Sequence, residues 1–315
     1  MDKPLSVGVV GVCENRLYAI CACDQMLTHD QQAADVGASK MMFYGDWIFI
    51  FAGALSSTDL TVEEIRLAIR EDDKALTREN IQTTLRRAYN NHVAHWNELR
   101  HLVSLGLTMR EFNSPDGTKR LGSKLHYEIG CSMHQDYEEN FSDEILVLGW
   151  GKMPHSVMLY SIGPGGEGLH GNDGCYAIGS GRDAAISTLF LLEHKASSHL
   201  QDAIYAVAAA KFSSESHGIG KSTTMWIARK RIDTDPADHP PGMPDLIIQE
   251  TEINELRSVW ERKGRPRIPI ESRQFTKKIT VRTKDDAVLD RQGNREFFEK
   301  LKQQSEAQKS EPEQS

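Results

Sequence analysis

The chain has 315 residues, of which 39% are hydrophobic and 26% are charged, and its formal net charge is -8. The negative balance argues against binding to nucleic acid or to an anionic membrane surface. No apolar run reaches the about 18 residues that a transmembrane helix needs, and the first residues lack the apolar core of a signal peptide. We therefore expect a cytoplasmic globular protein with no membrane or nucleic-acid partner.

Cysteine and histidine spacing gives no sign of a metal site. The five cysteines include no Cys-x-x-Cys pair, and the twelve histidines show no ligand spacing such as His-Glu-x-x-His. An odd number of cysteines in a chain without a secretory signal is typical of reduced, buried thiols. We expect neither a metal nor a cofactor.

The first part of the chain predicts strands. Residues 7–23 form two apolar runs around a polar turn, which is typical of a hairpin, and Asp24 ends the second strand. A polar loop is expected at 25–38. Lys40 then heads a second strand pair that ends at Gly53.

The hydrophobic period changes after this pair. It predicts helices at 58–71 and 78–100, a turn-rich loop at 113–124, and strands at 126–133, 144–150 and 156–162. Further along the chain we expect a strand at 175–181, helices at 182–195 and 199–211, and a strand at 223–232. Helices grouped in pairs between runs of strands indicate an α+β fold in which sheets lie between helical layers.

The composition shifts after residue 232. Residues 233–250 are rich in proline and predict a linker, whereas 251–315 form a charged extension with one short helix and a disordered end. We therefore divide the chain into a domain at 1–232, the linker and the extension.

Several landmarks in 7–232 resemble proteasome β-type subunits and related N-terminal-nucleophile (Ntn) hydrolases. They are the run YAICACDQ, a lysine sixteen residues after its aspartate, the strand ending FAG, the paired strands of DEILVLGWGKMPHSVMLYSIGPGGE, and AIGSGRDAAISTLF. The resemblance implies a four-layer αββα sandwich. It also implies self-association or a ring of related subunits, and a peptide or amide substrate if the protein is active.

The resemblance assigns roles to individual residues. Lys40 corresponds to the pocket lysine, Asp24 to its partner, and Ser180 to the serine near the terminal amine, while the Gly53 N–H would donate to the oxyanion. Each also has a structural alternative: Asp24 as a strand end, Lys40 as an edge charge, and Ser180 as a helix cap.

The expected nucleophile falls near Val7 or Gly8, which carry no hydroxyl. Ser6 is the nearest hydroxyl and would serve only after removal of residues 1–5. The loop FSSESHG also departs from the family's Asp-x-x-Ser-Gly pattern, with Glu215 as a substitute acid and Gly218 in place of the serine.

The sequence is compatible with three alternative functions. The sequence favours a non-catalytic, proteasome-like subunit, a pseudoenzyme candidate. The alternatives are an active amide-bond hydrolase that uses Ser6 after N-terminal processing, and a ligand-binding module that uses the inherited pocket. A nucleotide-binding P-loop at GIGKST is disfavoured, because Glu215 replaces the first glycine and a strand is expected after the motif.

Overall fold

The computed structural model describes residues 6–29, 32–35, 40–44, 47–53, 61–68, 77, 79–150, 157–215, 219–230 and 246–264. The chain divides into two compact units, Met1–Gly264 and Arg265–Ser315. The second unit, the linker at 233–245 and the loop residues 216–218 lie outside the described residues.

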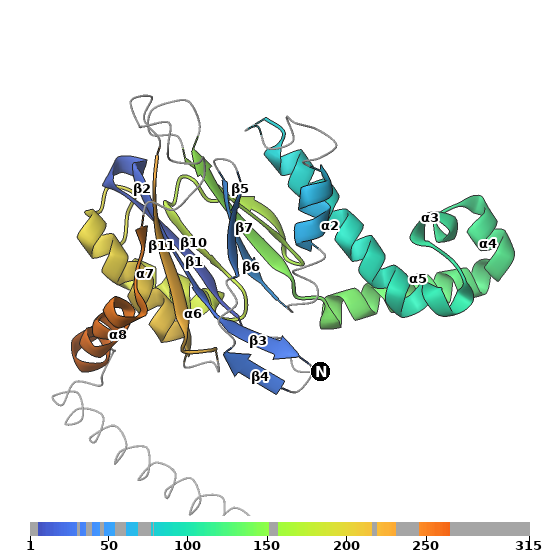
Figure 1. Ribbon diagram of the computed structural model, residues 1–315. Coiled ribbons are helices and arrows are strands. Elements are labelled where there is room, and N and C mark those ends of the chain that lie inside the picture. The colour runs from blue at the N-terminus through green and yellow to red at the C-terminus, as the bar shows by residue number, and fades with distance from the viewer. Residues whose placement is uncertain are drawn as a thin grey trace, which may run out of the picture. The chain divides into compact units, whose positions relative to one another are not determined.

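The fold is α+β, as expected, and contains two antiparallel five-stranded sheets (Figure 1). The first sheet has the order β10-β1-β2-β11-β12. Its strands are β1 (Gly8–Cys13), β2 (Tyr18–Asp24), β10 (Cys175–Ile178), β11 (Thr223–Arg229) and β12 (Leu246–Ile247). The second sheet has the order β5-β6-β7-β8-β9. It consists of β5 (Met41–Tyr44), β6 (Trp47–Ala52), β7 (Glu144–Trp150), β8 (Val157–Gly163) and β9 (Gly166–Leu169).

The inner core lies between the two sheets. Its buried side chains come from both sheets, with Val10 and Cys21 on one side and Ile50 and Leu148 on the other. The fully apolar strands β1 and β6 can be buried on both faces because a second core lies behind each sheet. The sheets are thus stabilised from both sides.

Helices supply these outer cores. Helices α6 (Arg182–Leu191) and α7 (Leu200–Ser214) contribute Leu189, Val207 and Phe212 to the core behind the first sheet. On the other side, α2 (Ile81–Asn97) contributes Ile81 and Leu85, and helical residues 61–68 contribute Ile65. Figure 1 shows α7 beside the first sheet and α2 beside the second.

A C-terminal helix also joins the first sheet's core. Helix α8 (Glu250–Val259) begins with a capping box between Gln249 and Glu252. It buries Ile253, and Leu256 and Trp260 pack against the same core. The segment 246–264 therefore belongs to the first compact unit, and the π-helical turn Trp260–Gly264 ends it.

The expected strand at 126–133 is wrong, because this segment lies inside α5 (Ser123–Asn140). Its apolar residues alternate in sequence, which mimics a strand, but Leu125 and Tyr127 are exposed. Pairs four residues apart favour the helix instead, including Gln135 with Glu139 at 2.8 Å.

Two expected loops are also wrong. The segment 113–124 contains α4 (Pro115–Leu121), where Ser114 caps the first turn and proline occupies a position that needs no N–H. A short helix, α3 (Met109–Phe112), precedes it. The expected loop at 25–38 contains the hairpin of β3 (Met26–His29) and β4 (Gln32–Asp35). In the segment 113–124, turn-forming residues thus start a helix rather than replace it.

Candidate active site

Ser6 lies just before β1 and is buried, with 1% of its surface exposed. Its backbone N–H donates to Oγ of Ser180 at 2.9 Å, and the Ser180 hydroxyl donates back to the Ser6 carbonyl at 3.2 Å. The N–H of Gly181 donates to the same carbonyl at 3.2 Å. Ser6 is therefore held at its backbone by a turn 174 residues further along the chain.

The side chain of Ser6 meets a buried ion pair. Nζ of Lys40 lies 2.9 Å from Oδ2 of Asp24 and 2.8 Å from Oγ of Ser6. The Ser6 hydroxyl lies 3.2 Å from Oδ1 of Asp24, which also accepts the N–H of Val7 at 2.8 Å. Asp24 is fully buried and Lys40 is 7% exposed. The structure thus brings together four of the residues singled out in the sequence: Ser6, Asp24, Lys40 and Ser180.

The two sheets supply opposite sides of this cluster. Asp24 ends β2, where it pairs in register with Thr223 of β11 and its N–H donates to the Val7 carbonyl. Lys40 immediately precedes β5, and its carbonyl accepts the N–H of Phe51 at 2.9 Å. The ion pair therefore depends on the sheets facing each other.

The turn that carries Ser180 requires a glycine beside it. Gly179 has φ +85°, and a Cβ there would collide with the carbonyl of Ser6. Its N–H donates to Oε2 of Glu144 at 2.9 Å. The Gly-Ser-Gly sequence thus lets the turn approach the backbone of Ser6 closely.

Gly53 follows β6 with φ +137°, and Asp143 lies against it. The carboxylate of Asp143 lies 3.0 Å from Nε2 of the buried His92. The side chain of the preceding residue, Ala52, would be among the nearest neighbours of a Cβ placed on Gly179. Gly53 therefore follows a β6 residue whose side chain lies beside the Ser180 turn, and its part in binding an oxyanion stays a prediction.

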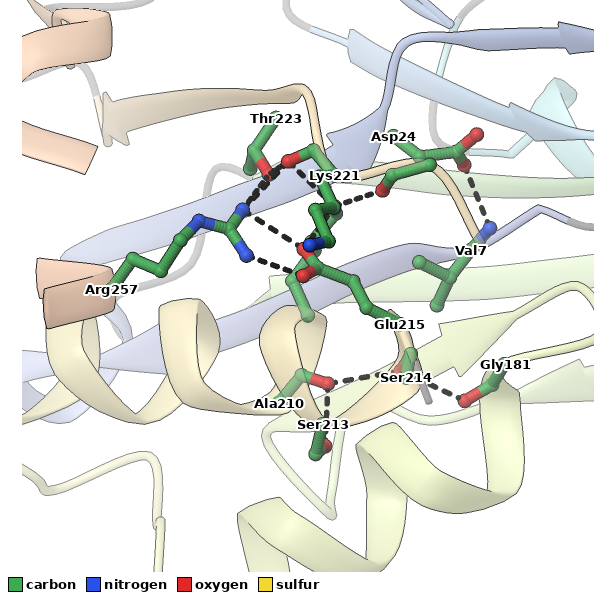
Figure 2. Close-up of polar contacts among 12 residues, drawn as sticks. Val7, Asp24, Gly181, Ala210, Ser213, Ser214, Glu215, Lys221, Thr223 and Arg257 are labelled. Atoms are coloured by element: carbon green, nitrogen blue, oxygen red, sulfur yellow. Dashed lines mark hydrogen bonds and ion pairs between the residues drawn. The ribbon is translucent and has the colours of Figure 1, made fainter. Parts of the chain in front are cut away.

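Glu215, considered as a substitute acid, contacts two cations, Lys211 and Arg257, and Figure 2 shows its contacts with Arg257. Its carboxylate lies 2.6 Å from Nζ of Lys211 and forms a bidentate salt bridge with the guanidinium of Arg257 in α8. Gly218 lies outside the described residues. Lys221 of the P-loop-like segment precedes a strand, as expected, and its carbonyl accepts from Arg257 at 2.6 Å.

Lys211 and Arg257 were not anticipated as parts of this region. Lys211 is fully buried in α7, and burial lowers its pKa, although the charges of Glu215 and Asp24 act in the opposite direction. The spacing of Lys211 and Glu215, four residues apart, is a signal in the sequence for such a pair. Nothing in the sequence connects Arg257 with them.

The arrangement suits acyl transfer. A hydroxyl is held against a cation and a carboxylate, and its own backbone nitrogen faces a second hydroxyl. Within the described residues, no group of three or more His, Cys, Asp or Glu side chains is placed to hold a metal ion. No helix among them is both long enough and apolar enough to cross a membrane.

Comparison with known families gave no matching family model. A search of curated proteins also found no match.

Solved structures do show similarity. Anbu from Hyphomicrobium sp. strain MC1 is 13% identical with a TM-score of 0.48, covering 82% of this chain and 95% of that one. A Gly-1 mutant of the same protein is 14% identical with a TM-score of 0.45, covering 84% and 100%. Anbu from Yersinia bercovieri, described as an ancestral beta-subunit, is 12% identical with a TM-score of 0.48, covering 84% and 99%.

The resemblance to proteasome β-type subunits is therefore corrected. The structures found to be similar are Anbu proteins, and no family model supports membership in the expected family. At 12–14% identity and TM-scores below 0.5, these structures do not establish a function for this chain.

Proposed function

We propose that this chain is an N-terminal-nucleophile hydrolase that cleaves amide bonds with Ser6, after scission of the Leu5–Ser6 bond. The supporting observation is the position of Ser6, with Oγ 2.8 Å from Lys40 and its nitrogen 2.9 Å from Ser180. The sequence alone favours a non-catalytic protein because no hydroxyl stands at the position expected for the nucleophile. The contacts of Ser6 favour the hydrolase alternative.

The fold agrees with this proposal. Two antiparallel sheets share one core, and each has a second core against helices on its other face. We infer a four-layer αββα sandwich of the Ntn-hydrolase type, with the nucleophile at the start of β1.

The proposed reaction begins at the amine that scission creates on Ser6. An α-amino group titrates near about 7.7–8.0, so its neutral form can accept the Oγ proton near neutral pH. Oγ then attacks the amide carbonyl, and the resulting tetrahedral oxyanion collapses as the C–N bond breaks. The leaving amine takes the proton from the Ser6 ammonium. Water, deprotonated by the same amine, hydrolyses the ester and restores Oγ–H.

Lys40 and Asp24 prepare the hydroxyl for this step. The ammonium of Lys40 points at Oγ and stabilises negative charge that develops on it. Asp24 balances the buried lysine and accepts the N–H of Val7, which fixes the residue after the nucleophile. Ser180 Oγ orients the nitrogen of Ser6. The Gly53 N–H is our candidate donor to the oxyanion.

The N-terminus of the mature protein tests the proposal. Intact-mass measurement on protein from its native source should show a chain that begins at Ser6, and this protein should hydrolyse fluorogenic peptide amides. A mature chain that retains Leu5 would exclude the mechanism. A ligand-binding role would instead be supported by a compound that raises the melting temperature without being cleaved.

Self-association is a further part of the proposal. Three consecutive apolar side chains at the end of α6 are exposed, namely Phe190, Leu191 and Leu192, and association is one way to remove such surface from water. Sedimentation velocity at increasing concentration should show an oligomer. A strictly monomeric protein would contradict this part while leaving the chemistry of Ser6 untouched.

A further inference from the structure

Arg257 of α8 bonds to a segment that leads into the site (Figure 2). Its guanidinium forms two contacts with the carboxylate of Glu215 and donates to the Lys221 carbonyl at 2.6 Å. Nη2 lies 3.4 Å from Oγ1 of Thr223. The carbon at its centre lies 4.3 Å from the centroid of the Phe212 ring. Arg257 is 15% exposed, so these contacts form largely away from solvent.

Lys211 of α7 also forms hydrogen bonds to the same segment. Its fully buried Nζ donates to Glu215 at 2.6 Å, to the Gly220 carbonyl at 2.5 Å and to the Lys221 carbonyl at 3.3 Å. Glu215 therefore lies between two cations, and both cations also bind the backbone at 220–221. The beginning of β11 is held by charge-assisted hydrogen bonds from α7 and α8.

This segment touches the site at two places. Thr223 pairs in register with Asp24, and the N–H of Gln25 donates to the Ser222 carbonyl at 3.2 Å. At the end of α7, Ser214 Oγ donates to the Gly181 carbonyl at 3.1 Å, next to Ser180. The end of α7 and the start of β11 thus adjoin both Asp24 and the Ser180 turn.

We propose that Arg257 is a positioning residue for the Ser6 site. Through Glu215, Lys221 and Thr223 it holds the start of β11, and hence Asp24, in the alignment that Lys40 and Ser6 require. The inference rests on the proposed function for its effect on catalysis, but the contacts can be tested without it. A planar guanidinium can bind both carboxylate oxygens and a carbonyl together, whereas a lysine ammonium lacks this fork.

The catalytic test compares three variants of the full chain on a fluorogenic peptide amide that the wild type cleaves. Arg257→Gln should lower kcat by about 10- to 100-fold with KM unchanged, because small misplacements of reacting groups slow chemistry more than binding. Arg257→Lys should recover only part of this loss. Arg262→Gln is the matched control, since exposed Arg262 bonds only to the Ser258 carbonyl among the contacts described, and it should keep wild-type kcat.

The melting temperature of each variant is measured first, so that all rates are compared at a temperature at which every variant is folded. A wild-type kcat in Arg257→Gln, full rescue by Arg257→Lys, a rise in KM alone, or an equal loss in Arg262→Gln would each overturn the positioning role.

Hydrogen exchange separates this inference from the proposed function. In Arg257→Gln, amides at 222–225 should exchange at least about tenfold faster than in the wild type and in Arg262→Gln, since local opening costs less once these bonds are lost. Unchanged exchange overturns the inference even if the enzyme is active. Faster exchange in a chain that retains Leu5 and cleaves nothing would support the role of Arg257 in holding the start of β11 and reject the proposed hydrolase function.

Discussion

The hydroxyl oxygen of Ser6 lies 2.8 Å from Nζ of Lys40, and the same ammonium lies 2.9 Å from the carboxylate of Asp24. The three residues come from the starts of β1 and β5 and the end of β2. A nucleophile held this way has a cation beside the atom that must become negative.

We further propose that Ser6 itself performs the scission of the Leu5–Ser6 bond, so replacing the nucleophile should stop both maturation and hydrolysis. We expect Ser6→Ala to lower amide hydrolysis by about a thousandfold or more, because no atom is left to form the acyl ester. Ser6→Thr keeps a hydroxyl and should keep measurable activity. Intact mass and peptide-amide hydrolysis read the two effects, and wild-type activity in Ser6→Ala would rule out this nucleophile.

Breaking the buried ion pair should cost far more stability than breaking an exposed one. Lys40→Met leaves the carboxylate of Asp24 buried without its cation, which we expect to cost about 3–5 kcal/mol of unfolding free energy. The control is Arg66→Met, whose partner Glu63 lies 2.5 Å away with both side chains at least half exposed, and it should cost under about 1 kcal/mol. Urea denaturation measures both, and equal losses would contradict burial as the cause.

A methyl group on Gly179 should displace Ser6. Gly179→Ala adds a Cβ that collides with the Ser6 carbonyl at a residue with φ +85°, so we expect loss of maturation together with destabilisation.

The matched control is Gly166→Ala, where φ is +101° but a Cβ meets nothing within 4 Å. Gly166→Ala introduces the same kind of backbone strain, which costs roughly 1 kcal/mol of unfolding free energy, but no collision. This variant should therefore mature normally. Mass spectrometry and denaturation distinguish the two variants, and normal maturation of Gly179→Ala would show that the close approach is unnecessary.

The thiol of Cys175 should make stability depend on alkaline pH. Burial, aided by the charge of Asp173, raises the pKa of Cys175 to about 11 from the ordinary value of 9.0. Between these values the unfolded chain loses the proton while the folded chain keeps it, so the folded state binds more protons and stability falls as pH rises.

Relative to Cys175→Ala, the wild type should lose on the order of 1 to 2 kcal/mol between pH 8 and 10.5. Urea denaturation of both proteins at the two pH values cancels the titration of other groups. A constant difference would show that this thiol ionises equally in both states.

Much of the fold could be read from hydrophobic periodicity. The strand at 144–150 is confirmed as β7 (Glu144–Trp150), and the helices expected at 182–195 and 199–211 are α6 and α7. Hydrophobic periodicity gave the wrong prediction in α5, because apolar residues there alternate in sequence as in a strand although some of them are exposed on a helix. Caps such as Ser114 were read as turns because the same residues serve both purposes.

For the site, the resemblance of the Asp24–Lys40 spacing to that of a known family singled out the ion pair, and Ser6 was the hydroxyl nearest to the position that the same resemblance gives the nucleophile. Only the family resemblance connected Ser180 with the terminal amine; local patterns could not, since 174 residues separate Ser6 from Ser180 and the contact depends on β1 pairing with β10. Arg257 was missed for the same reason, because it lies 42 residues from Glu215.

By itself the sequence determined which segments are apolar enough to be strands and helices, and which polar residues stand at their ends. It did so because burial pattern and capping are local properties of the chain. Only the tertiary structure decided that the Ser6 hydroxyl, the Lys40 ammonium and the Asp24 carboxylate meet at one point. Strand pairing and the facing of two sheets set those distances, and both arise from contacts between residues far apart in the chain.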